Sequence, residues 1–97
     1  MEDNEHIVYM LKCNDNTLYT GYTNDLEHRL EMHNTGKGAK YTRGRGPFQV
    51  VFVEKLTTKE AALQKEYQIK QLTRKEKFQL IRDKLKEVMQ YENTEKL

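Results

Sequence analysis

The segment from His33 to Pro47, HNTGKGAKYTRGRGP, combines residue types that could bind phosphate. Glycines and hydroxyl side chains are interspersed with four cations: Lys37, Lys40, Arg43 and Arg45. Two of these cations flank Tyr41 and Thr42, and such a set can pair with phosphate oxygens and stack on a base or sugar. The spacing is not that of a nucleotide-binding P-loop, which needs G-x-x-x-x-G-K-[ST] between a strand and a helix. We therefore predict contact with a nucleic-acid backbone, against the alternative of a flexible, charged surface loop.

Positive charge is concentrated in the same part of the chain. Residues 28–46 hold five cations and one acid, whereas residues 1–27 hold one cation and six acids. Residues 47–97 hold eleven cations and eight acids, so the formal net charge of the whole chain is only +2. A local basic region on a nearly neutral protein indicates an anionic partner at one place rather than general coating of DNA.

A predicted helix over residues 58–72 carries a carboxylate among apolar side chains. At about 100° per residue, Glu66 falls in the middle of an arc that contains Ala61, Ala62, Leu63, Tyr67, Ile69 and Leu72. An unpaired carboxylate is costly in a core, so Glu66 needs a cation beside it. A salt bridge to Lys70, one turn further on, would be a purely structural solution.

The predicted first helix, over residues 25–34, also carries polar residues on its buried side. Arg29 and His33 lie four residues apart on the same side as two leucines. An ion pair for Arg29 and a hydrogen-bonded imidazole at the edge of the core for His33 are the structural alternatives. His28 and His33 do not share a helix face, and with Cys13 as the only cysteine the chain has too few ligands for zinc.

A predicted hairpin supplies two tyrosines. If Cys13 pairs with Thr17, then Tyr9 lies opposite Gly21, and Tyr19 points to the same face of the sheet. A glycine weakens a strand unless something approaches it closely, so Gly21 indicates space used by the Tyr9 ring. Two core aromatic residues are the alternative to a functional pair.

These side chains need a sheet and helices to position them. β-branched and aromatic residues predict strands over residues 7–13, 18–22 and 48–56, with Asn16 at a left-handed turn position. Three predicted helices begin at capping patterns: Asn24 with Glu27, Thr57 with Glu60, and Thr73 with Glu76. The first helix should end near Gly36. The order β-β-α-β-α-α predicts an α+β fold, a three-stranded antiparallel sheet flanked by helices.

The last predicted helix has an apolar stripe formed by Phe78, Ile81, Leu85 and Val88. We expect this stripe to pack onto the sheet and complete the core, with a dimer seam as the alternative. The whole chain, residues 1–97, is expected to be one domain with its core at about residues 6–90 and with residues 92–97 frayed. A single cysteine and an acidic, polar N-terminal stretch favour a cytoplasmic location, and no apolar run is long enough to span a membrane.

Taken in order, these residues resemble the GIY-YIG nuclease superfamily, and in particular its small stand-alone bacterial branch. The first triad is present as residues 7–9, Ile-Val-Tyr, and the second as residues 19–21, Tyr-Thr-Gly. Three further positions match the family's arginine, histidine and helix-borne metal-binding glutamate: Arg29, His33 and Glu66. The first triad lacks its glycine, and the asparagine that many larger members place after the metal helix has no counterpart except Asn93 near the end of the chain.

The resemblance implies hydrolysis of a phosphodiester by water, with one divalent ion, Mg²⁺ or Mn²⁺, held by Glu66. Arg29 would neutralise charge on the scissile phosphate, and Tyr9 and Tyr19 would orient or deprotonate the water, with the choice between them left open. Lys40 and His33 are expected to lower the pKa of the tyrosine base. The expected nucleic-acid-binding residues are those of the basic loop: Lys37, Lys40, Tyr41, Thr42, Arg43 and Arg45.

The implied substrate is nucleic acid, with DNA favoured over RNA, in a repair or recombination process. Larger relatives append target-reading domains, for which this chain has no room, so a partner protein could supply specificity. We expect a monomer rather than a dimer. The alternatives are a catalytically silent nucleic-acid-binding module that uses the same basic loop, and an adaptor that binds a protein through the last helix.

Overall fold

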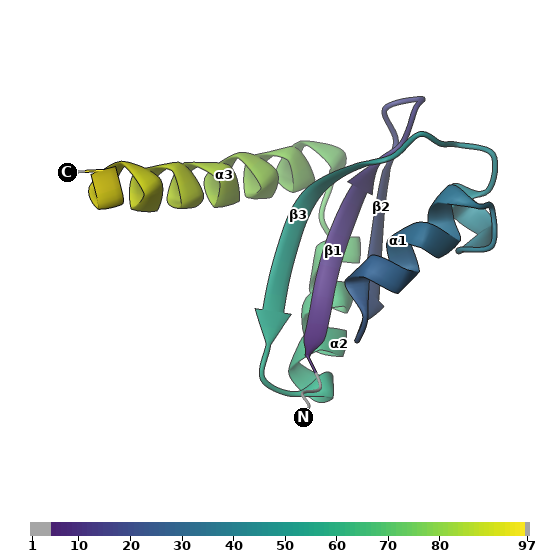
Figure 1. The fold of residues 1–97 in the computed structure, drawn as a ribbon, viewed down its shortest axis with the longest axis horizontal. Coiled ribbons are helices and arrows are strands. Elements are labelled where there is room, and N and C mark those ends of the chain that lie inside the picture. Colours follow the sequence, from purple (N-terminus) through teal and green to yellow (C-terminus); the bar gives the residue numbers. More distant parts are fainter. Residues whose placement is uncertain (1–4, 97) are drawn as a thin grey trace.

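The computed structural model describes residues 5–96, with side chains described for residues 5–87. A three-stranded antiparallel sheet contains β1 (His6–Lys12), β2 (Leu18–Thr23) and β3 (Gln49–Leu56) in the order β2-β1-β3 (Figure 1). The helices are α1 (Leu26–Asn34), α2 (Lys59–Lys70) and α3 (Arg74–Lys96), with a short 3₁₀ turn at Lys40–Thr42. This confirms the predicted α+β fold class and the predicted order of its elements.

The hairpin has the predicted register. Tyr9 pairs with Gly21, and the backbone N–H of Cys13 donates to the carbonyl of Thr17 at 2.8 Å. Asn16 has a φ of 68°, the left-handed conformation expected at this turn. Because side chains alternate along a strand, this register sends Tyr9, Tyr19 and Gly21 to one face of the sheet.

The two faces of the sheet have different coverings. On one face, Val8 and Met10 of β1 and Phe52 of β3 pack with Ala62 and Ile69 of α2 into the hydrophobic core. Helix α1 lies across the opposite face, over the side of β1 that carries Tyr9 (Figure 1). The apolar core therefore forms under α2, and the polar candidate residues of the hairpin face α1.

Two helix starts differ by one residue from the prediction. Asp25, not Asn24, caps α1 by accepting a hydrogen bond from the backbone N–H of His28. Thr58, not Thr57, caps α2 through the N–H of Ala61 at 3.0 Å. Each wrong choice stands next to a residue with an equally suitable side chain, so the capping pattern in the sequence did not distinguish the two.

The start of α3 agrees with the prediction. The Thr73 hydroxyl accepts from the N–H of Glu76 at 3.1 Å, and the Glu76 carboxylate accepts from the N–H of Thr73 at 2.9 Å. This reciprocal pair is a capping box. The helix therefore begins at a point determined by its own local sequence.

The predicted apolar stripe of α3 is only partly used. Leu80 and Ile81 pack against the core, whereas Leu85 is 58% exposed. The reason is that α3 leaves the sheet after its first turns and extends away from it (Figure 1). Val88 lies beyond the described side chains, and α3 is described to Lys96, through most of the stretch that we expected to be frayed. Among the described residues, no helix combines the length and the apolar character needed to cross a membrane.

Candidate active site

The face of the sheet under α1 holds a chain of hydrogen bonds centred on Tyr9. The Tyr9 hydroxyl lies 2.8 Å from His33 Nε2, and Arg29 Nε donates to the Tyr9 oxygen at 3.4 Å. Tyr9 is fully buried and His33 is 2% exposed. Strand β1 thus provides the phenol and α1 provides the imidazole and the guanidinium, as their four-residue spacing on the helix allows.

The partners of His33 determine where its protons lie. The Thr42 hydroxyl donates to the carbonyl of Ala39 at 2.9 Å, so its oxygen accepts from His33 Nδ1 at 2.8 Å. A neutral imidazole with its hydrogen on Nδ1 has Nε2 free to accept the proton of the Tyr9 hydroxyl. The hydrogen bonds therefore run from Tyr9 through His33 and Thr42 to the backbone.

Burial tunes both titrating groups of this chain. It lowers the pKa of His33 below its usual range, and the nearby Arg29 charge acts in the same direction. Burial also raises the pKa of Tyr9 to about 12, although the hydrogen bond from Arg29 opposes this. If Tyr9 is the base, the lowered pKa that we expected from Lys40 and His33 is not observed, because loss of solvent outweighs the effect of Arg29.

Two glycines make room for this arrangement. A Cβ on Gly21 would lie 2.6 Å from the Tyr9 hydroxyl and 2.9 Å from a ring carbon of Tyr19. A Cβ on Gly38 would collide with the ring of His33, whose carbon Cε1 would be 2.9 Å away. The first of these close approaches is the one predicted from Gly21, and the second explains a glycine inside the basic loop.

Aromatic rings extend the cluster towards solvent. The Tyr19 ring lies 5.2 Å from the ring of His33 and 6.2 Å from that of Tyr9, measured between centroids. On its other side Tyr19 stacks on Tyr41 at 6.0 Å, and Tyr41 is 46% exposed. Tyr19 is thus the link between the buried hydrogen-bond chain and the exposed loop.

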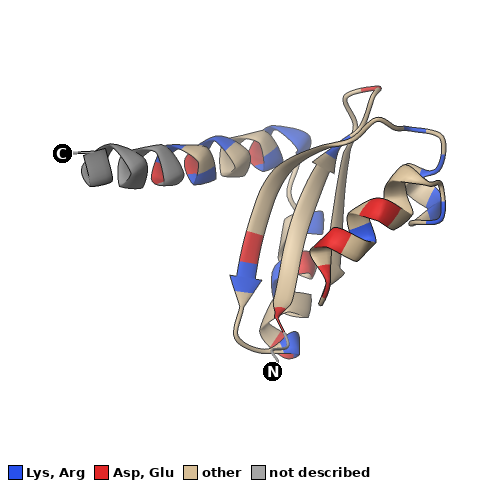
Figure 2. Cartoon of the chain, viewed as in Figure 1, with Lys and Arg blue, Asp and Glu red and all other residues tan. Residues whose placement is uncertain are grey.

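The structure divides the residues of the basic loop between exposed positions and internal contacts. Lys37, Lys40 and Arg43 are exposed, and the cations of this loop lie beside the end of α1 (Figure 2). Thr42 is 1% exposed and holds His33, a role different from the phosphate contact that we expected. Within the described side chains, no hydrogen bond joins Lys40 to Tyr9, so the support expected from Lys40 stays a prediction.

Arg45 anchors the loop to the hairpin. Its guanidinium pairs with Asp15 at 2.6 Å and lies over the Tyr41 ring at 4.7 Å from the centroid. The backbone carbonyl of Arg45 also accepts from the N–H of Asn14 at 2.8 Å. These contacts hold the loop, and Tyr41 with it, against the start of β2, and they leave Arg45 only partly exposed.

Glu66 lies at the edge of the core rather than in its middle. Its side chain is 19% exposed and pairs with Lys70 Nζ at 3.1 Å, the salt bridge that we weighed as the structural alternative. Leu63 and Tyr67 are 43% and 66% exposed, so the apolar arc on α2 is narrower than predicted. In the described residues, no group of three or more carboxylate, histidine or cysteine side chains could hold a metal.

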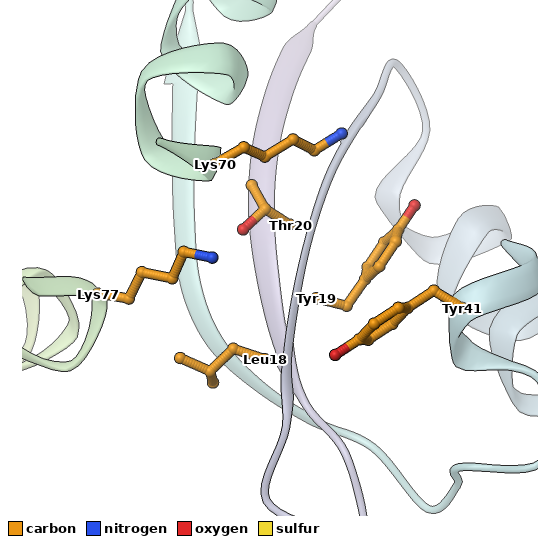
Figure 3. A pocket seen from close by; sticks show the side chains of 6 residues that line it. All are labelled: Leu18, Tyr19, Thr20, Tyr41, Lys70 and Lys77. Atoms are coloured by element: carbon orange, nitrogen blue, oxygen red, sulfur yellow. The ribbon is translucent and has the colours of Figure 1, made fainter. Parts of the chain in front are cut away.

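An open hollow joins α2 to the aromatic cluster across the outer edge of β2. Six residues line this hollow of about 330 Å³: Leu18, Tyr19, Thr20, Tyr41, Lys70 and Lys77 (Figure 3). Lys70, the partner of Glu66, thus shares one surface with Tyr19 and Tyr41. Glu66 itself does not line the hollow and is joined to it through Lys70.

Sequence reasoning did not identify Thr42 as the partner of His33 or Lys77 as a lining residue. Nothing in the local pattern distinguishes Thr42 from other loop hydroxyls. Lys77 lies in a helix with many lysines, and because Lys70 belongs to another helix, their spacing in the sequence did not indicate a shared surface.

Comparisons with known proteins agree with this geometry. Residues 5–79 match the model of the GIY-YIG catalytic domain. The chain is 66% identical over 79 residues to a UPF0213 protein of Oceanobacillus iheyensis, a match that covers 81% of this chain and 92% of the relative. It is 52% identical over 84 residues to the UPF0213 protein YazA of Bacillus subtilis, with 87% and 85% covered.

Two solution NMR structures have similar folds. A UPF0213 protein from Bacillus halodurans, 51% identical, has a TM-score of 0.55 over 79% of this chain and 82% of that protein. A protein from E. faecalis, 40% identical, has a TM-score of 0.61 over 84% of this chain and 88% of that protein. From the catalytic-domain match, the relatives and the arrangement of tyrosines, arginine and histidine, the chain belongs to the GIY-YIG family.

Proposed function

We propose that this protein is a metal-dependent endonuclease that hydrolyses phosphodiester bonds of nucleic acid, with DNA favoured over RNA. The observation that carries the proposal is the buried hydrogen bond from Tyr9 to a neutral His33, placed next to Arg29 and an exposed basic loop. A role in repair or recombination of branched or damaged DNA belongs to the same proposal. We further propose that the chain acts as a single domain and a monomer, with target choice supplied by a partner protein.

In this proposal Tyr9 takes the proton of the attacking water, which reaches its hydroxyl, buried in the free protein, when the bound substrate opens a path to it. A pKa of about 12 keeps Tyr9 protonated at neutral pH, so the free enzyme does not hold it as a phenolate that could act directly as a general base. It can act as a relay, because it can give its proton to His33 Nε2 while it receives one from water. The low pKa of His33 keeps Nε2 unprotonated and ready for that transfer. Tyr19 assists, since its ring packs against both partners.

Arg29 has two tasks in the proposed reaction. It donates to the Tyr9 oxygen and so stabilises negative charge on it during transfer. Its remaining guanidinium N–H groups can neutralise charge on the scissile phosphate. A positive group between the base and the phosphate serves both steps at once.

Glu66 fits a site for one divalent ion. Its carboxylate is largely buried and therefore needs a positively charged partner. In this structure the Lys70 ammonium group is that partner, and a metal ion could take its place. With one carboxylate, the other positions around Mg²⁺ or Mn²⁺ would be taken by waters and phosphate oxygens, an arrangement that these hard cations accept. When bound, the ion would supply Lewis-acid stabilisation of charge on the phosphate.

The test is cleavage of plasmid and branched DNA with Mg²⁺ or Mn²⁺, with chelator as the blank. Glu66→Gln keeps the shape of the side chain and should slow cleavage by about 100-fold or more, because a metal ligand supplies several kcal/mol. Glu60→Gln, an exposed change in the same helix, is the matched control and should cleave like the wild type. Equal rates in the two variants would refute the proposal.

One observation favours a second candidate, a nucleic-acid-binding module without cleavage. Lys70 already neutralises Glu66, so the carboxylate has no need of a metal for stability. This module would bind through the exposed cations Lys37, Lys40 and Arg43, with affinity that falls steeply with salt. If the protein is such a binding module, the cleavage assay described above should give no metal-dependent product from any of the DNA substrates.

A further inference from the structure

We propose that the hollow at the outer edge of β2 binds a second phosphate of the nucleic-acid strand whose cleavage is proposed above. The hollow lies on the other side of the edge strand from Tyr9 and is lined by Lys70 of α2 and Lys77 of α3 (Figure 3). Of the six residues that line the hollow, Tyr41 alone belongs to the basic loop, so the hollow is a different surface from the one formed by that loop's cations. The inference rests on the proposed function for the identity of its ligand.

Two ammonium groups converge on the hollow from different helices. Lys70 is at the last position of α2, and Lys77 is in the first turn of α3, so the short connection between the helices brings them together. In Figure 3 both side chains extend towards β2. Lys70 Nζ pairs with Glu66 at 3.1 Å, and no carboxylate is among the six described residues that line the hollow itself, so Lys77 adds a second ammonium group whose charge favours an anion.

Arg74 fixes the start of α3 in this position. Its guanidinium donates to the backbone carbonyl of Asn16 at 2.7 Å and lies over the ring of Phe78 at 4.8 Å. These contacts tie the first turn of α3 to the β1–β2 turn. They hold Lys77 at the hollow while Arg74 itself is engaged elsewhere.

Thr20 supplies an unused polar group at the floor of the hollow. It is 4% exposed, and its Oγ1 has no hydrogen-bond partner among the described residues. A buried hydroxyl without a partner is unfavourable for folding, so this Oγ1 is available to a ligand that enters the hollow. Because Oγ1 is buried in this structure, neighbouring side chains have to move aside for a phosphate oxygen to reach it.

The position of β2 makes the hollow continuous with the tyrosine cluster. This strand is at the edge of the described sheet, and Tyr19 lines the hollow while its ring contacts His33. Tyr41 and Leu18 add an aromatic ring and an apolar surface beside the cations, which suits a base and sugar attached to the phosphate. A free anion would need no such surface, so we assign the hollow to a nucleic-acid strand.

The first test measures binding without cleavage. Fluorescence anisotropy of a labelled single-stranded DNA in chelator should show that Lys77→Gln weakens binding about tenfold, the loss of one charge-assisted hydrogen bond. The slope of log affinity against log salt should become shallower by about 0.7. Lys75→Gln removes the same charge from the same turn at an exposed position outside the hollow and should change neither value. Equal effects of the two substitutions would overturn the proposal.

Thr20→Val separates binding from folding. Because the hydroxyl has no partner in the protein, the variant should be as stable as the wild type or more stable in urea unfolding, yet bind the DNA more weakly. A loss of stability with unchanged binding would assign the hydroxyl to the fold instead.

A chemical counterpart identifies the ligand. Replacing single phosphates of the DNA by neutral methylphosphonates should reveal one linkage at which Lys77→Gln has no further effect, because both changes remove the same contact. If inorganic phosphate competes as well as DNA, the hollow is a general anion site and the assignment to a strand is wrong. These measurements use no metal. If the protein binds DNA in this way but never cleaves it, the proposed endonuclease function is refuted, whereas the proposed phosphate site in the hollow stands.

Discussion

Tyr9 connects the sheet, the first helix and the basic loop through one oxygen atom. That oxygen accepts from Arg29, donates to His33, and reaches the loop through the bond from His33 to Thr42. A side chain needed only for core volume would satisfy its hydroxyl with one partner. The double engagement with a cation and a neutral base is what makes this position suited to proton transfer.

We predict that Tyr9→Phe abolishes metal-dependent cleavage, with a fall of about 10²-fold or more, as expected for loss of a proton-transfer group. Binding of DNA in chelator should be unchanged, because Tyr9 is fully buried. Tyr22→Phe removes a hydroxyl that bonds to His6 on the other side of the sheet and is the matched control. Cleavage by Tyr9→Phe at the rate of this control would show that the phenol is not used.

His33 should make stability depend on pH. Its pKa in the folded protein lies below the ordinary value of about 6.5, because burial disfavours the charged ring. The unfolded chain therefore binds more protons below that pH, and the free energy of unfolding should fall as the pH is lowered from 7.5 through 6.5. Urea unfolding at a series of pH values measures this.

A variant pair checks the assignment of that pH dependence. His33→Gln should remove the dependence between pH 7.5 and 5.5, whatever it does to stability itself. His28→Gln changes an exposed histidine of the same helix and should retain it. A dependence that survives in His33→Gln would belong to another group.

At the scale of elements, capping decides where α2 begins and hence which of its residues face the sheet. Thr58→Ala should lower the free energy of unfolding by about 1 kcal/mol, since it removes the acceptor for the N–H of Ala61. Thr57→Ala changes the exposed neighbour, which does not cap the helix, and should stay within about 0.5 kcal/mol of the wild type. Thermal or urea unfolding of the pair measures the difference, and a reversed order would place the cap at Thr57.

The α2–α3 junction is the element on which the two proposals meet. Helix α2 supplies Glu66 and Lys70, and the capping box at Thr73 starts α3 so that Lys77 follows within its first turn. Both lysines reach the edge of β2 because the connection is short. A longer connection would separate Glu66, the carboxylate proposed to hold the metal, from Lys77.

At the scale of the whole molecule, the core is completed by one chain. Val8, Met10 and Phe52 are buried under α2, and α3 adds only Leu80 and Ile81 before it leaves the sheet. All the described residues of this core come from one chain. The exposure of Leu85 bears on the dimer seam and adaptor hypotheses for α3, because either would need this residue at an interface.

We predict that Leu85→Glu leaves both mass and stability unchanged. Light scattering should give the monomer mass, 11.6 kDa, for wild type and variant alike. The free energy of unfolding should differ by no more than about 0.5 kcal/mol, as for other exposed positions. Ile81→Glu places a charge against the core and should destabilise strongly, which shows that the assay responds. If the wild type is a dimer and Leu85→Glu dissociates it, the dimer interface on α3 is supported and the monomer prediction is wrong.

The order of the elements, the hairpin register and the capping box at Thr73 were all accessible from the sequence, because each depends on residues close together in the chain. The two triads, Arg29, His33 and Glu66 were identified differently, through the resemblance of this ordered set of residue types to the GIY-YIG superfamily. Their geometric relations required the fold. A helical wheel places Glu66 in the middle of the apolar arc of α2. In the structure Leu63 and Tyr67 are exposed, so that arc is narrower and Glu66 lies at the edge of the core.

What the tertiary structure decided are the partners of each polar group. Thr42 lies nine residues from His33 and becomes its partner only because the loop turns back over α1. The pKa of Tyr9 depends on loss of solvent, which outweighs the effect of Arg29 and is a property of the assembled sheet and helix. Lys70 and Lys77 share a surface with Tyr19 because β2, which carries Tyr19, is the edge strand of the sheet and both helices end or begin beside it. Local propensities determine which elements form, whereas burial, charge and proton position depend on contacts between residues far apart in the chain.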